Sequence, residues 1–153
     1  MSAYIQFFIR NNEAFMPIGT YCRSSAIYQA FDEYIPWEKI RPITEPLLRK
    51  IYNNVIDDIR EHTDQIDKIK EHRAFIATFN NPMDEKIEML DSIEEILGDY
   101  EEGLEQLNTV KSYIHFLNDI IEAVEFEDSI DENNYLYAGI EIGISPTIED
   151  IVQ

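Results

Sequence analysis

From Thr44 to Ile76 the sequence reads TEPLLRKIYNNVIDDIREHTDQIDKIKEHRAFI, and the predicted fold class follows from this segment. Mostly apolar residues recur in it at alternating spacings of four and three: Leu48, Tyr52, Val55, Ile59, His62, Ile66, Ile69, Arg73 and Ile76. This spacing lines up side chains along one side of an α-helix and is typical of a coiled-coil seam. Thr44 is a suitable N-cap, and Pro46 lies in the first turn, where its missing N–H costs nothing. We therefore predict a helix over residues 44–79.

A second helix is predicted over residues 82–126, after the break at Asn80-Asn81. Its seam continues the same spacing, apart from one extra step of three between Leu107 and Val110: Leu90, Ile93, Leu97, Tyr100, Leu104, Leu107, Val110, Ile114, Leu117, Ile121 and Val124. Because the connection is short, the two helices are expected to pack antiparallel as a hairpin. Gly98 and Gly103 lie inside the second helix, where each predicts a close crossing or a bend.

Residues 1–42 and 135–144 are predicted to form a small α/β head. Ala3–Arg10 and Ala14–Ile18 alternate as strands around an Asn11-Asn12 turn, and Pro17 predicts that the second strand lies at an edge or ends there. Ser24 or Ser25 can cap a short helix that runs to about Tyr34. Residues 35–42 are expected to be an ordered connector, and residues 135–143 a strand that joins the N-terminal hairpin.

The sequence thus predicts an α+β fold in a single domain, residues 1–153. A small antiparallel sheet, made of the N-terminal hairpin and the C-terminal strand, carries one short helix. A long antiparallel, coiled-coil-like helical hairpin projects from it, and residues 145–153 form a tail.

The net charge of −19 is concentrated in the second half of the chain. Residues 1–42 hold four acids and four bases, and residues 43–79 hold seven acids and six bases. Residues 80–153 hold twenty acids against two bases, a net charge of −18. A field of this sign disfavours nucleic acid and anionic membrane as direct ligands, and it favours basic proteins or cations.

Acidic residues on the second helix recur at spacings of three and four, and so form a like-charged stripe about 32 Å long at the helical rise. This acidic stripe consists of Asp84, Glu88, Asp91, Glu95, Asp99, Glu102 and Glu105. Like charges at these spacings destabilise a helix by a few tenths of a kcal/mol per pair. The stripe is therefore either a solvated face that maintains solubility or a docking surface for a partner.

No motif for catalysis, metal or cofactor binding is found, and we expect no enzymatic activity, no metal and no cofactor. A di-iron bundle needs Glu-x-x-His, and no Glu in the chain is followed three residues later by His. His115 and Asp119 share a helical face at a spacing of four, which is more often a hydrogen-bonding pair than a ligand pair. Gly-rich phosphate loops, nucleophile elbows and zinc spacings do not occur.

Polar residues at seam positions are expected to control the register of the helices. His62 fits this role, and Arg73 is predicted to reach an acid on the facing helix. Cys22 is the only cysteine, which precludes an intramolecular disulfide and indicates a buried or half-buried thiol in a reducing compartment. We expect a cytoplasmic protein of a bacterial or phage-infected cell, with no membrane contact.

Two hypotheses for the function follow. In the first, the acidic stripe binds a basic protein, such as a nucleic-acid-processing enzyme, in place of phosphates. In charge and size alone the chain resembles small phage-encoded inhibitors of host defence nucleases, of the anti-restriction or anti-CRISPR type. In the second, the helical hairpin is an assembly module that forms homo-oligomers through apolar residues beside the seam: Ile51, Ile56, Ile87, Ile96 and Ile120.

Overall fold

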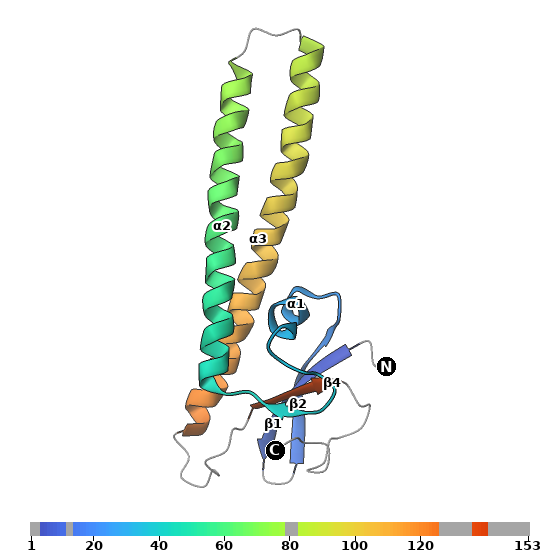
Figure 1. Cartoon of the computed structure of the whole chain (residues 1–153), viewed down its shortest axis with the longest axis vertical. Helices are drawn as coiled ribbons and strands as arrows, with labels where there is room; N and C mark the ends of the chain where they lie inside the picture. The colour runs from blue at the N-terminus through green and yellow to red at the C-terminus, as the bar shows by residue number, and fades with distance from the viewer. Residues whose placement is uncertain (1–3, 12–13, 79–82, 126–135, 141–153) are drawn as a thin grey trace. The chain divides into compact units, whose positions relative to one another are not determined.

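The computed structural model describes residues 4–11, 14–78, 83–125 and 136–140 (Figure 1). Its elements are β1 (Tyr4–Asn11), β2 (Ala14–Cys22), α1 (Ala26–Asp32), β3 (Arg41–Pro42), α2 (Glu45–Ala77), α3 (Met83–Glu125) and β4 (Leu136–Ile140). The predicted α+β class is confirmed. The predicted tail, and the end of the predicted last strand beyond residue 140, lie outside the described residues.

The four strands form one antiparallel sheet in the order β2-β1-β4-β3. The N-terminal hairpin and the return of β4 to β1 were both predicted. The strand β3 was not predicted. Residues 35–42 were expected to be a connector, but Arg41 and Pro42 pair with Ala138 and Tyr137 of β4. Two residues are too few to show an alternating pattern, so only the pairing with β4 reveals this strand.

Pro17 lies on β2, which is an edge strand, as predicted. The strand does not end there, however, and continues to Cys22. The pairing changes from Phe7 with Gly19 to Phe8 with Pro17, so Ile18 is the extra residue of a β-bulge. An edge position beside a bulge accommodates a residue that has no N–H to donate.

The core of the sheet is built around Phe7 and Phe8 of β1, both of which are buried. The ring of Phe7 makes edge-to-face contacts with Phe31 of α1 and Tyr113 of α3, both with centroids 5.2 Å apart. Phe8 points to the opposite face of the strand, as neighbouring residues do. There it belongs to a second buried cluster, which comprises Phe8, Phe15, Ile40 and Tyr137.

The two long helices begin and end near the predicted positions. The Thr44 hydroxyl accepts from the Leu47 N–H at 3.3 Å and so caps α2, as predicted. At the other end, the Lys86 ammonium donates to the Ala77 carbonyl at 3.0 Å, which satisfies one of the free carbonyls of the last turn. The short helix α1 is capped by Ser25, whose hydroxyl accepts from the Tyr28 N–H at 3.1 Å.

Both predicted seams are confirmed by burial. Every described seam residue of α2 and α3 is buried or half-buried. The contacts show that the two helices run antiparallel. Tyr52 in the first part of α2 contacts His115 in the last part of α3, whereas Arg73, later in α2, contacts Glu94, earlier in α3. None of the described helices is long and apolar enough to cross a membrane.

The chain divides into two compact units, to which both long helices contribute. Unit 1 comprises Met1–Asn54 and Val110–Gln153, and unit 2 comprises Val55–Thr109. Unit 1 therefore contains the sheet, α1, the start of α2 and the end of α3. Unit 2 is the remainder of the helical hairpin. The single domain expected from the sequence stays a prediction.

Candidate functional site: the acidic stripe of α3

The acidic stripe lies entirely within unit 2 and faces solvent. All seven of its carboxylates are exposed: Asp84, Glu88, Asp91, Glu95, Asp99, Glu102 and Glu105. Since successive residues of an α-helix are rotated by about 100°, these seven project within a sector of about 120°. The seam residues Ile93 and Leu97, which are buried, project from the opposite side of the helix. Packing of the hairpin therefore leaves the whole stripe uncovered within this unit.

The carboxylates of the acidic stripe have no cationic partners in the described part of the chain. Ion pairs there join Arg49 to Glu45, Arg60 to Asp57 and Arg73 to Glu94, and no stripe residue takes part. Lys86 is the one base within residues 83–105, and its ammonium donates a hydrogen bond to the Ala77 carbonyl. The negative charge of the stripe is therefore not neutralised by described residues.

Apolar side chains border the stripe and are unusually exposed. On α3, Met83 is 72% exposed, Ile87 and Ile96 are each 49% exposed, and Met89 is 39% exposed. Helical geometry places Met83 and Ile87 on one side of the stripe, and Met89 and Ile96 on the other. The sequence places Ile87 and Ile96 beside the seam, and the packing of unit 2 leaves about half of each residue in solvent.

The polar seam residues of unit 2 contact the facing helix. The Arg73 guanidinium donates to the Glu94 carboxylate at 2.6 Å, so the predicted pairing with an acid on the facing helix is confirmed. His62 is half-buried, packs edge-to-face on Tyr100 with centroids 5.5 Å apart, and its Nδ1 lies 2.9 Å from the Asp58 carbonyl oxygen. A carbonyl can only accept, so this nitrogen carries the proton.

The two helical glycines differ in their surroundings. A Cβ on Gly103 would stand 3.0 Å from His62 Nε2, closer than carbon and nitrogen normally approach, so the predicted close crossing occurs here. A Cβ on Gly98 would meet nothing within 4 Å. No described residue of this chain therefore requires glycine at position 98.

The candidates for metal binding do not form a site in the described residues. His115 and Asp119 are both exposed, and His115 packs edge-to-face on Tyr52 with centroids 5.3 Å apart. No group of three or more His, Cys, Asp and Glu side chains in the described ranges is arranged to hold a metal ion.

Cys22 is exposed at the end of β2, so the expectation of a buried or half-buried thiol is wrong. The strand carries this position past the core, to where the turn into α1 begins. The Sγ lies 3.1 Å from the Ser24 hydroxyl, and this hydrogen bond lowers the pKa of the thiol. The guanidinium carbon of the neighbouring Arg23 lies 5.8 Å from the centre of the Tyr28 ring.

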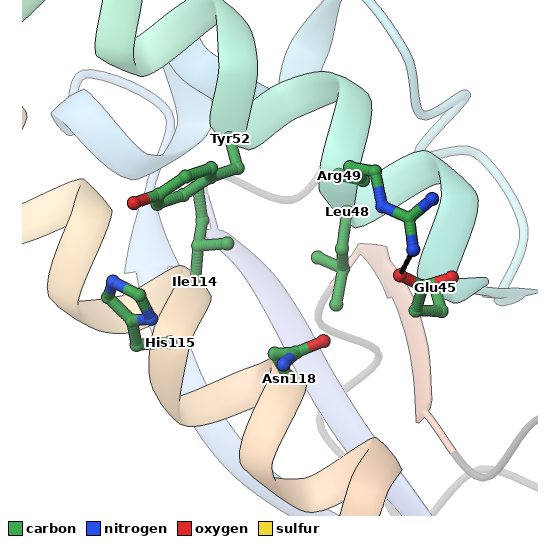
Figure 2. Close-up of a pocket in the computed structure, with 7 residues that line it drawn as sticks. All are labelled: Glu45, Leu48, Arg49, Tyr52, Ile114, His115 and Asn118. Carbon is green, nitrogen blue, oxygen red and sulfur yellow. Dashed lines mark hydrogen bonds and ion pairs between the residues drawn. The ribbon is translucent and has the colours of Figure 1, made fainter.

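A small pocket in unit 1 lies between the start of α2 and the end of α3 (Figure 2). It is lined by Glu45, Leu48, Arg49, Tyr52, Ile114, His115 and Asn118 and has a volume of about 210 Å³. Arg49 is paired with Glu45, one turn away on α2, at the edge of the pocket. Pockets for drug-sized ligands usually exceed about 300 Å³.

No family model, no curated protein sequence and no solved structure matches the chain.

Proposed function

We propose that the protein is a non-enzymatic binding module that docks onto a basic partner through the acidic stripe of α3. The observation that carries the proposal is the run of seven exposed carboxylates without cationic partners among the described residues. Each neighbouring like-charged pair at a spacing of three or four costs the helix about 0.2–0.5 kcal/mol. The exposed face of α2 also holds neighbouring acids, such as Glu61 and Asp64, but bases lie among them, as with Arg60 beside Asp57, and offset part of this cost. A cationic partner would offset the cost on α3.

The partner class follows from the length and sign of the stripe. A rod of carboxylates about 32 Å long can occupy a groove whose lysines and arginines otherwise contact phosphates. This favours a nucleic-acid-processing enzyme as the partner. The protein then acts as a small phage-type inhibitor that mimics nucleic acid. Direct binding of nucleic acid is disfavoured, because both surfaces are negative.

The test is a charge reversal with a matched control. Immobilised protein is incubated with bacterial lysate at about 50 mM and about 500 mM salt, and captured proteins are identified by mass spectrometry. A captured basic protein should be released by high salt and by a competing oligonucleotide. The triple variant Glu95→Lys, Asp99→Lys, Glu102→Lys should not capture it.

The control variant carries Glu61→Lys, Asp64→Lys and Asp67→Lys on α2, where all three acids are exposed. It changes the net charge by the same amount and should keep the partner. If both triple variants lose the partner, total charge and not the stripe is responsible for capture; if both keep it, the acids of the stripe are not needed. The proposal would then be abandoned.

An alternative is that the hairpin is an assembly module. The half-exposed Ile87 and Ile96 beside the seam support it, because a second subunit could cover them. Against it, unit 2 holds sixteen acids and five bases, a net charge of −11, so two copies repel one another. Light scattering at high protein concentration decides: a strict monomer at about 0.5 M salt, where repulsion is screened, removes this alternative.

A further inference from the structure

Gly98 lies in the middle of α3, where a glycine costs about 1 kcal/mol relative to alanine. Gly103 is explained by the His62 ring that lies against it. At Gly98, the space that a Cβ would occupy is open. The absence of a side chain at this position creates a shallow, accessible stretch of backbone on the exposed side of α3.

This stretch lies in a row that joins apolar and acidic side chains. Ile87, Asp91, Gly98 and Glu105 are separated by four, seven and seven residues, so they project within about 40° of one another along one edge of the stripe. Met83 extends the apolar end by one further turn. The edge therefore presents exposed apolar surface at one end, a gap at Gly98, and carboxylates around the gap.

We propose that this edge binds a basic amphipathic helix of a partner protein, which crosses α3 over Gly98. Its apolar side contacts Ile87 and Met83, and its lysines or arginines pair with Asp91 and Glu105. The proposal rests on the proposed function and deepens it by naming the element that the stripe recognises. Recognition of an amphipathic helix by a surface with matching apolar and charged positions is a recurring mode of binding.

Charge selects this occupant over a second copy of the chain. The helical hairpin of unit 2 carries a net charge of −11, and a second hairpin would bring another edge of carboxylates against Asp91 and Glu105. A basic helix supplies the opposite charge. The gap at Gly98 also lets its axis approach within the 8–10 Å typical of packed helices.

The probe for the test is a synthetic peptide of about 21 residues, which spans about 32 Å as a helix. It is composed of leucine and lysine, with leucines at helical spacings of three and four on one side. A scrambled peptide of the same composition has no apolar side. Binding of each labelled peptide to the full chain is measured by fluorescence anisotropy. The amphipathic peptide should bind about tenfold more tightly than the scrambled one.

Two matched protein variants locate the contact. Ile87 and Ile96 are equally exposed, at 49%, but lie on opposite sides of the stripe. Ile87→Ser should weaken binding of the amphipathic peptide about tenfold, whereas Ile96→Ser should change it less than twofold. Gly98→Leu fills the gap from a position where a Cβ meets nothing within 4 Å, so it should raise the melting temperature and yet weaken binding about tenfold.

Each contrary result has a defined meaning. Equal effects of Ile87→Ser and Ile96→Ser, unchanged affinity in Gly98→Leu, or equal binding of the two peptides would overturn the amphipathic helix. If both peptides still bind and the triple charge reversal abolishes their binding, the proposed docking through the stripe stands without this refinement. If the charge reversal leaves peptide binding unchanged, the proposed function fails as well.

Discussion

The guanidinium of Arg73 on α2 donates to the carboxylate of Glu94 on α3 at 2.6 Å, and this ion pair joins the two helices of unit 2. The arginine side chain is 37% exposed and the glutamate side chain 56% exposed. Water therefore screens the pair, and its contribution is expected to be small.

We predict a coupling free energy of about 0.5 kcal/mol between Arg73 and Glu94. A double-mutant cycle with Arg73→Ala, Glu94→Ala and the combined variant, followed by urea unfolding, measures it. The value should decrease at about 1 M salt. Additive effects of the two substitutions on the free energy of unfolding at low salt would show that the ion pair contributes nothing to stability.

The two glycines of α3 should respond in opposite ways to alanine. Gly98→Ala should stabilise the protein by up to about 1 kcal/mol, since the new methyl group enters open space. Gly103→Ala gains the same helix propensity but forces the His62 ring to move, which costs about 1–3 kcal/mol. Thermal unfolding of both variants checks the difference. Combining Gly103→Ala with His62→Ala should recover the gain in propensity if the ring is the obstacle.

Gly19 of β2 is predicted to tolerate no larger residue. A Cβ there would stand 2.5 Å from the Tyr113 hydroxyl oxygen, so Gly19→Ala should destabilise the protein by about 2 kcal/mol. Tyr113→Phe removes that oxygen, which is buried and has no hydrogen-bond partner among the described residues. Alone it should be neutral or stabilising, and combined with Gly19→Ala it should restore part of the loss. Chemical unfolding of the three variants provides the measurement.

Stability should fall in alkaline solution because of Tyr113. Burial raises the pKa of its phenol above the ordinary value, and the neighbouring Tyr21 adds a smaller effect in the same direction. Above about pH 10 the unfolded chain releases this proton and the folded chain retains it, so unfolding becomes more favourable as the pH rises. Melting temperatures from pH 8 to pH 11 should decrease less steeply for Tyr113→Phe. Parallel curves for the two proteins would contradict this assignment.

Cys22 should be more reactive than an unperturbed thiol. Its pKa is lowered chiefly by the hydrogen bond from the Ser24 hydroxyl, and the side chain is exposed. Since the thiolate is the nucleophile, Ser24→Ala should slow alkylation by iodoacetamide at pH 7.5 by about two- to threefold. The rate is followed by mass spectrometry. A Ser25→Ala variant is unsuitable as a control, because Ser25 caps α1; Thr20→Ala, at an exposed position on the same strand, serves instead.

For the two long helices, local spacing was enough to predict which residues are buried. The alternation of threes and fours identified which side of α2 and α3 is buried, and it placed Arg73 where it could reach an acid on the facing helix. It also placed the acidic stripe away from the seam. These features depend only on the period of the α-helix, which is the same wherever a helix occurs.

Other features required the tertiary structure. The strand β3 exists because β4 lies beside residues 41–42, and the sequence around Pro42 has no strand pattern of its own. The thiol of Cys22 is exposed because β2 continues past Pro17, through a bulge that spacing did not reveal. These outcomes depend on contacts between residues distant in sequence.

Gly98 and Gly103 show the same division between sequence and structure. Spacing along the chain predicts that two glycines lie inside a long acidic helix and that an acidic stripe runs along one side of it. That Gly103 faces His62, and that Gly98 faces open space, is seen in the folded hairpin and not in the spacing. The physical reason is that helical period specifies the direction in which a residue points, whereas the neighbour it meets there depends on the packing of another segment.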